Sequence, residues 1–494
     1  MHERISNKYV VILITLLFIV GAFSVSSREI TETSTILPMK NSSHPILKNS
    51  SPLYDGWQQI NQDGFGDKND VVTRAMTVYA GYLCVGVTNM NLSSGEINGC
   101  ELWYYNGTAW IQSVGNHPGA LIGSGFGNTH NAECSILVAF HGFLYAGTEN
   151  YHDGCELWRT TNPVNGNWEK VVAKGFGDRS NVGMWSTEIF NNDLYIGTFC
   201  YKGCQLWRTA NGTDWEAVVG GSSHTPSGFG AFMNVYAWSM KVYDGKLYVG
   251  TQNMLGGEIW RSPDGNTWEC LVGRKGDYPR GFQVFDVNYG IRTLNIFNGD
   301  LYAGTAAMPS VAVSLEITGI FNRTHRIPMF RSPEVGLQIW RLNASNDRVW
   351  DRVVGGFRGV NSSRNGFGNN HNVYAWTMNV FRDALYVGTY NVKREYITVS
   401  FKEMFQDMKK GGIAFWVGSD MLKKKGDGCE IWKTVDGTNW VQVVGNETPG
   451  PGNGFGDVNN NGARSMSIYQ MNHEDAFIVG TSNAVTGCEI WRYQ

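Results

Sequence analysis

The stretch that decides the fold begins Ser239-Met-Lys-Val-Tyr-Asp-Gly-Lys-Leu-Tyr-Val-Gly-Thr251 and continues, after a short loop, as Glu258-Ile-Trp-Arg-Ser-Pro-Asp-Gly-Asn-Thr-Trp268. Polar and apolar residues alternate along it with the period of two that is typical of β-strands. Asp244-Gly245 fits a tight hairpin turn, because both residue types adopt the positive φ angles that such a turn needs. We therefore expect four short antiparallel strands, over 239–243, 246–251, 258–261 and 267–272.

The same unit recurs seven times along the chain. Each copy has a strand that ends in or near Gly-Thr, a Gly-Cys-Glu-Leu/Ile-Trp segment or a variant of it, a turn with a second Trp, and a Gly-Phe-Gly segment or its variant. The first Trp of the successive copies is Trp103, Trp158, Trp207, Trp260, Trp340, Trp432 and Trp491. Four-stranded units repeated at this spacing are typical of β-propeller blades.

The two ends of the repeat region are complementary. It starts with a copy of the fourth strand, around Trp57, and stops after a copy of the third strand, around Trp491. An open solenoid would instead need atypical capping repeats at its ends. We predict an all-β fold, a seven-bladed β-propeller over 55–494 made of four-stranded antiparallel blades. The pairing of its N- and C-terminal strands in one blade closes the ring.

The fifth and sixth units are longer than the others, because insertions at 306–336 and 391–428 separate their second and third strands (the B–C loops). In a propeller these loops lie on the same face as the D–A connections between blades. Residues 398–410 fit a short amphipathic helix within the second insertion.

The amino-terminal residues have the composition of an export segment. Residues 1–27 hold a charged flank, an apolar run and then small residues, which indicates a signal peptide or an N-terminal membrane anchor. The Ser/Thr/Asn-rich residues 28–54 resemble a flexible spacer. Nine Asn-x-Ser/Thr triplets fit a secreted glycoprotein. We expect an extracellular protein, secreted or anchored to the outer face of the membrane. The net charge of −3 gives no case for nucleic-acid binding.

The turns between the third and fourth strands carry a family resemblance. Ser262-Pro-Asp264-Gly-Asn-Thr-Trp268 and Thr434-Val-Asp436-Gly-Thr-Asn-Trp440 resemble the Asp-box (BNR) motif of sialidase-like propellers, although Gly follows Asp directly here. The resemblance implies a propeller with this motif on the hairpin before the fourth strand. It implies no particular activity, because sialidases, reductases and pure binding propellers share the motif.

Residues that recur in every unit are interpreted as scaffold. The Glu or Gln two residues before each Trp is one such position, since a catalytic carboxylate would be special to one or two blades. The cysteine before it is another, in five of the units. Cys200 stands apart, because it faces Cys204 across a short hairpin; a Cys200–Cys204 disulfide is therefore a candidate in an oxidising compartment.

A ligand site is expected where the units differ. One position on each first strand varies strongly: Arg74, Ser135, Trp185, Trp238, Arg292, Trp376 and Arg464. Guanidinium groups match carboxylates and indole rings stack on sugars, so these arginines and tryptophans form a candidate anion or carbohydrate site near the central channel. Tyr236, Tyr374 and His371 are close in sequence and join it. The alternative is that the tryptophans pack between blades and the arginines solvate the channel.

A second candidate site holds oxygen ligands. Asp63, Asp67, Asn69 and Asp70 lie together in a loop and could bind Ca²⁺, the only cofactor for which the sequence offers candidate ligands. Ordinary Asx turns are the alternative interpretation. No Cys/His spacing indicates zinc.

The sequence favours a secreted or surface-anchored propeller that binds a ligand or partner, such as a carbohydrate or an anionic group. The site would lie on the face of the D–A and B–C loops. Two alternatives remain open: an extracellular polysaccharide-active enzyme, a glycoside hydrolase or lyase at the channel mouth, and a structural envelope or adhesion module. No catalytic constellation is identified.

Overall fold

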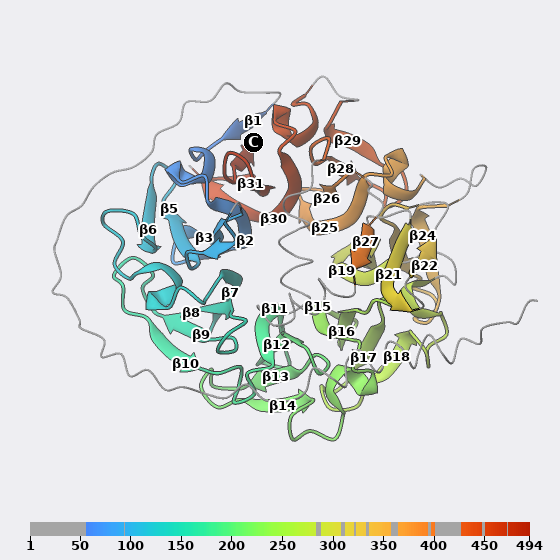
Figure 1. Ribbon diagram of the computed structural model, residues 1–494. Helices are drawn as coiled ribbons and strands as arrows, with labels where there is room; N and C mark the ends of the chain where they lie inside the picture. The colour runs from blue at the N-terminus through green and yellow to red at the C-terminus, as the bar shows by residue number, and fades with distance from the viewer. Residues whose placement is uncertain are drawn as a thin grey trace, which may run out of the picture.

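Figure 1 shows the computed structural model of the chain. It describes residues 56–92, 94–282, 288–307, 312–320, 323–331, 335–356, 364–393, 397–400, 426–446, 450–471 and 473–494. The predicted export segment (1–27) and spacer (28–54) lie outside the described residues. In the part of the chain that is described, no helix is long and apolar enough to cross a membrane.

The fold is all-β, as predicted, and is built from four-stranded antiparallel sheets. Four strands in chain order form each of the first four sheets. They are β2 (Asp70–Tyr79), β3 (Tyr82–Asn91), β5 (Glu101–Tyr105) and β6 (Trp110–Val114); β7 (Glu133–Phe140), β8 (Phe143–Glu149), β9 (Leu157–Thr160) and β10 (Glu169–Val172); β11 (Asn181–Phe190), β12 (Asp193–Cys200), β13 (Leu206–Thr209) and β14 (Glu216–Val219); and β15 (Tyr236–Tyr243), β16 (Lys246–Gln252), β17 (Ile259–Ser262) and β18 (Glu269–Val272).

The remaining sheets include strands that are not consecutive in the chain. They are β19 (Asn288–Phe297), β20 (Asp300–Ala307), β23 (Ile339–Leu342) and β24 (Trp350–Val354); β25 (Asn372–Phe381), β26 (Ala384–Asn391), β28 (Ile431–Thr434) and β29 (Val441–Val444); and β30 (Asn460–Met471), β31 (Glu474–Asn483), β32 (Ile490–Tyr493) and β1 (Trp57–Gln59). In the last sheet, Trp57 pairs with Tyr493 and Gln59 pairs with Trp491.

The sheets are arranged about a common centre, and the first strand of each lies nearest to it (Figure 1). Single bridges join the second strand of one sheet to the first strand of the next, as at Phe199 and Tyr236 or at Tyr390 and Gly462. A bridge between Ser482 and Val72 joins the last sheet to the first.

The Gly-Phe-Gly segment explains how neighbouring units pack. Its Phe takes a left-handed φ, and its ring stacks flat on the Trp of the third strand in the next sheet. Phe65 and Trp103 have ring centroids 4.5 Å apart at an interplanar angle of 9°. The same stack forms in Phe126–Trp158, Phe176–Trp207, Phe229–Trp260, Phe282–Trp340, Phe367–Trp432 and Phe455–Trp491.

The recurring Glu or Gln holds this Trp in place. In the β15 sheet, Glu258 Oε2 accepts hydrogen bonds from Trp260 Nε1 at 2.9 Å and from Asn234 Nδ2 at 2.8 Å. The turn that resembles an Asp-box is capped as its chemistry predicts: Asp264 Oδ1 accepts from the backbone N–H of Asn266 and of Thr267, at 2.8 and 2.7 Å. The hydroxyl of Thr267 donates to Asp264 Oδ2 as well, and this bond together with the backbone bonds holds the pKa of Asp264 below its usual range. They belong to the scaffold.

The cysteines are buried free thiols. The Cys200–Cys204 bridge that was a candidate from the sequence is not formed. The Sγ of Cys200 lies 3.4 Å from Ser180 Oγ instead.

The two long insertions meet in a sheet of their own. Strands β21 (Ala312–Ile320) and β22 (Arg323–Arg331) form an antiparallel hairpin, and β27 (Ile397–Ser400) pairs with β21 in parallel. The helix expected over 398–410 is therefore wrong for its first residues, because strand pairing with the other insertion overrides local helical periodicity. Residues 401–410 lie outside the described part.

Candidate functional site

A β-bulge lies at the same place in the first strand of each of these sheets. In β2 the register shifts between Thr73 and Ala75, which leaves Arg74 as the additional residue of the strand. A bulge inserts one residue into a strand and re-aims its side chain. The equivalent bulge residues are Ser135, Trp185, Trp238, Arg292, Trp376 and Arg464. The variable position found in the sequence is thus a bulge position.

Arg74 is paired with two carboxylates. Its Nε lies 2.5 Å from Glu133 Oε2 and its Nη2 lies 3.5 Å from Glu149 Oε2. Its guanidinium also lies over the ring of Trp185, at 4.0 Å from the centroid. The indole Nε1 of Trp185 donates to Glu149 Oε2 at 2.8 Å. Arg74 therefore belongs to a compact ionic and aromatic group.

Arg292 and Arg464 are buried without such partners. Their exposed fractions are 5% and 8%. Nε and Nη2 of Arg292, and Nε of Arg464, have no hydrogen-bond acceptor among the described residues. Burial, and then the charge of Arg74, lowers the pKa of Arg292 to about 9. Burial and the charges of Arg292 and Arg74 lower the pKa of Arg464 as well. The molecule therefore holds excess positive charge at its centre.

Aromatic side chains surround these arginines. Arg292 lies 5.0 Å from the ring centroid of Trp238, and Arg464 lies 5.3 Å from that of Trp376. Edge and tilted ring contacts form a continuous series through Trp185, Tyr236, Trp238, Tyr374, Trp376 and Tyr390. Tyr289 and Tyr374 share a hydrogen bond through their hydroxyls. Guanidinium groups are weakly hydrated, so they can pack favourably against these aromatic rings.

Glu149 and Tyr151 are site residues that the sequence did not single out. The hydroxyl of Tyr151 donates to Glu149 Oε1. Burial, followed by the charge of Glu133, raises the pKa of Glu149 to about 8. Glu133, which also contacts Arg74, occupies the same repeat position as Tyr236 and Tyr374. A comparison of the units at that position indicates Glu133 as a site residue.

His371 belongs to a different place. Its Nδ1 lies 2.7 Å from Asp427 Oδ2, and its backbone N–H donates to Asn369. Of the nine candidate ligand-binding residues, the structure thus gathers the arginines, tryptophans and tyrosines, and it pairs His371 with the loop before β28.

The candidate calcium ligands differ in their hydrogen bonds and burial. Asp63 Oδ1 accepts from Gln59 Nε2 at 2.8 Å, and Asp67 Oδ1 caps the backbone N–H of Asn69 at 2.9 Å, as in an Asx turn. Asp70 is buried at the start of β2.

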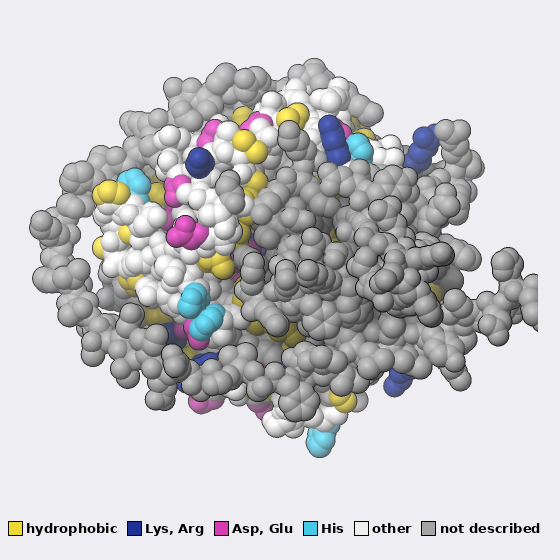
Figure 2. Space-filling view, viewed as in Figure 1, with side chains coloured by type: hydrophobic (Ala, Val, Ile, Leu, Met, Phe, Trp, Pro, Cys, Tyr) yellow, Lys and Arg dark blue, Asp and Glu magenta, His cyan; other side chains and the backbone are white. Residues whose placement is uncertain are grey.

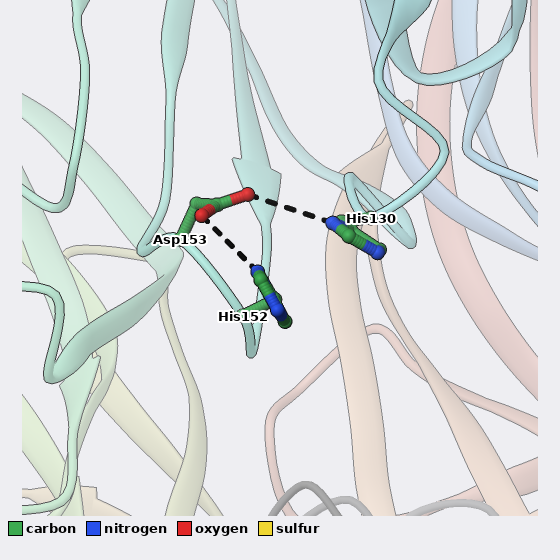
Figure 3. A group of neighbouring side chains, drawn as sticks. All are labelled: His130, His152 and Asp153. Carbon is green, nitrogen blue, oxygen red and sulfur yellow. Dashed lines mark hydrogen bonds and ion pairs between the residues drawn. The ribbon is translucent and has the colours of Figure 1, made fainter. Parts of the chain in front are cut away.

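A third group lies on the surface of the β7 sheet. Asp153 is 3.5 Å from His130 Nδ1 and 3.1 Å from His152 Nδ1, and the two imidazoles stack with centroids 4.4 Å apart (Figure 3). These ligand atoms lie within 4.8 Å of one another and could meet a metal ion. The His130–Asp153 pair repeats the His371–Asp427 pair, so loop-to-loop pairing accounts for it without a metal.

The described surface in the view of Figure 2 carries scattered acidic and histidine side chains and no gathering of Lys or Arg. This agrees with the net charge of −3.

No protein-family model matches the chain, and no curated protein matches it either. Distant likenesses exist among solved structures. An α-L-arabinofuranosidase from Clostridium thermocellum is 14% identical, over 58% of this chain and 94% of that one, with a TM-score of 0.30. A GH43 endo-arabinanase from Bacillus licheniformis is 12% identical, over 57% and 98%, with a TM-score of 0.30. The N-terminal domain of Nup159 is 8% identical, over 91% and 98%, with a TM-score of 0.39. None of these likenesses carries an argument about function.

Proposed function

We propose that the chain is a closed seven-bladed β-propeller, distantly related to Asp-box propellers, that binds an anionic ligand at its centre. Three observations support the ring: the pairing of β1 with β32, the bridge between Val72 and Ser482, and the Phe–Trp stack repeated from unit to unit. The export segment that the composition of residues 1–27 predicts supports a place outside the cytoplasm, secreted or anchored.

One observation carries the proposal of an anionic ligand: buried guanidinium N–H groups of Arg292 and Arg464 have no acceptor in the described chain. An unsatisfied buried donor costs about 1–3 kcal/mol, and more when it is charged. Such groups are rare in native proteins and need an explanation. A bound carboxylate or similar anion would supply both acceptors and countercharge.

The surroundings favour a sugar acid over a small inorganic anion. Aromatic rings line the arginines, and an indole or phenol face stacks on a pyranose ring while a guanidinium holds its carboxylate. We therefore propose uronic or sialic acid residues, free or in a polysaccharide, as the ligand class.

Calorimetric titration tests this. The purified protein is titrated with glucuronic, galacturonic and sialic acids and their oligosaccharides, with glucose and galactose as neutral controls. We expect acid-selective binding that falls at least tenfold in an Arg292→Gln/Arg464→Gln variant. An H371Q variant is the matched control and keeps its affinity, because His371 pairs elsewhere. Equal binding of acidic and neutral sugars, or none, contradicts the proposal and leaves a structural or adhesive role.

A second candidate function is hydrolysis or elimination on an acidic polysaccharide. Glu149, whose pKa is raised to about 8, is protonated near neutral pH and lies beside Glu133, Arg74 and Tyr151. A carboxyl of raised pKa next to a second carboxylate is suited to general acid catalysis. Product release from acidic polysaccharides that is lost in E149Q would support the enzyme. Binding without product release would support the first proposal.

A further inference from the structure

A buried network of hydrogen bonds recurs at the start of the first strand in six sheets. An Asn donates through Nδ2 to the first glycine carbonyl of the preceding loop and to the recurring Glu or Gln. In the β7 sheet, Asn131 donates to Gly125 O at 2.8 Å and to Glu156 Oε2 at 2.9 Å. The equivalents are Asn181 with Gln205, Asn234 with Glu258, Asn288 with Gln338, Asn372 with Glu430 and Asn460 with Glu489.

The β2 sheet has Asp70 in place of this Asn. An ionised carboxylate only accepts hydrogen bonds, so Asp70 cannot make either donation. Its side chain is 1% exposed, and no donor among the described residues reaches either carboxylate oxygen in hydrogen-bonding geometry, although the side chains of Glu101 and Asn89 lie close to it. Val87 also stands where the other sheets have a Thr, such as Thr148, whose hydroxyl donates to Asn131. The substitution therefore breaks a network that is complete elsewhere.

Further carboxylates converge on the same place. Asn89, which pairs with Asp70 in the strand register, donates through Nδ2 both to Asp67 Oδ2 at 3.1 Å and to Glu101 Oε1 at 3.2 Å. Asp67, Asp70 and Glu101 all line one cavity of about 270 Å³.

Side-chain cations neutralise the equivalent Glu in two other sheets. Lys170 lies 2.7 Å from Glu156, and Arg280 lies 2.6 Å from Glu258. Around Asp70 and Glu101, the residues that line the cavity include no Lys or Arg. His117 is the one residue of this lining whose side chain could carry a positive charge, so the carboxylates here have no Lys or Arg as a countercharge.

We propose that this cavity binds a hard divalent cation of the Ca²⁺ class, with Asp70, Asp67 and Glu101 as carboxylate ligands. Carboxylate oxygens are the donors such ions prefer. The ion would join the loop before β2 to strands β2 and β5, replacing the two hydrogen bonds that the Asn makes elsewhere. This ligand set differs from the one expected from the sequence. Asp63 is excluded because it accepts a hydrogen bond from Gln59, and Glu101 is a ligand in its place.

Terbium luminescence and thermal unfolding of the full chain, stripped with EDTA, test the site. Trp103 lines the cavity and can sensitise bound Tb³⁺. We expect terbium emission that Ca²⁺ displaces, and a Tm that rises with added Ca²⁺. In D70N, we expect the affinities for Tb³⁺ and for Ca²⁺ to fall at least tenfold. The Tm of D70N in EDTA should equal or exceed that of the wild type, because Asn can make the hydrogen-bond donations that the equivalent Asn makes in the other sheets. D63N is the control and keeps both responses.

Two outcomes would overturn the cation site. One is a wild-type protein whose Tm and terbium emission do not respond at millimolar cation. This result, with D70N more stable than wild type, would mean that Asp70 instead carries a proton that it donates to Glu101. The other is D70N that binds cation as well as wild type does.

Discussion

Arg292 lies with its guanidinium carbon 5.0 Å from the ring centroid of Trp238, while its Nε and Nη2 find no acceptor in the described chain. The indole face compensates part of the charge, since a cation over an aromatic ring gains about 0.5–2 kcal/mol. It does not replace the lost hydrogen bonds. Binding of an anion would therefore stabilise Arg292, because the anion would accept the hydrogen bonds that these N–H groups lack.

Replacing this arginine should separate stability from binding. We expect R292M to raise the free energy of unfolding without ligand by about 1–3 kcal/mol, because it removes a buried charge that lacks a partner. Anion binding should fall at least tenfold in the same variant. Urea unfolding and calorimetry measure the two effects. R159M removes a partly exposed ion pair with Glu169 and a cation–π contact with Phe143, and should change stability by about 1 kcal/mol or less. A destabilised R292M would show that the arginine is structural.

Arg74 should behave in the opposite way. Its removal leaves the carboxylate of Glu133 without its cation, and breaking a buried pair in this way costs about 3–5 kcal/mol. We expect R74M to be destabilised by this order, and R74M/E133Q to recover part of the loss. A double-mutant cycle from urea unfolding gives the coupling. Additive effects would contradict the pairing.

Glu149 should make stability depend on pH. Its folded pKa, about 8, lies above the unfolded value of 4.5, so the folded state binds the proton more tightly. This contribution is fully present below pH 4.5, is lost as pH rises towards 8, and then levels off. We expect the wild type to lose on the order of 4 kcal/mol more than E149Q between pH 5 and 9. Urea unfolding at several pH values tests this, and parallel curves for the two proteins would contradict it.

Trp57 tests the pairing of the two ends. It packs on Phe455 and Phe477 in the last sheet, with ring centroids 5.1 and 6.3 Å apart. We expect W57A to lose about 3–5 kcal/mol, as for a large core side chain. V435A is the control, because Val435 is exposed and should change stability by about 0.5 kcal/mol or less. A neutral W57A would mean that the β1–β32 pairing contributes little.

The repeat predicted the sheets well, because each landmark has a local physical role. The Phe and Trp of each unit stack, and the Glu that precedes the Trp holds its indole, as at Phe229, Trp260 and Glu258. The all-β class is confirmed. Contacts between distant insertions could not be predicted in this way: β27 pairs with β21, and no local pattern encodes that register.

The candidate site was predicted only in part. Comparing units at one position found Arg74, Arg292 and Arg464, yet strict alternation could not show that this position is a bulge. Glu149 lies on a second strand, at a position whose residue type also differs between units, and its contact with Arg74 is what marks it as part of the site. Cys200 is close to Cys204 in sequence, but the direction of its side chain, towards Ser180, depends on packing.

The recurring bulge has a consequence for how such a protein could change. The additional residue of each first strand lies outside the regular ladder, so its identity is uncoupled from strand pairing. Arg, Trp and Ser all occupy it in this chain without altering the sheet around it. Single substitutions at the bulge position can therefore change the side chains at the centre of the molecule one unit at a time. A new ligand specificity could arise in this way without any change in the pairing of the strands.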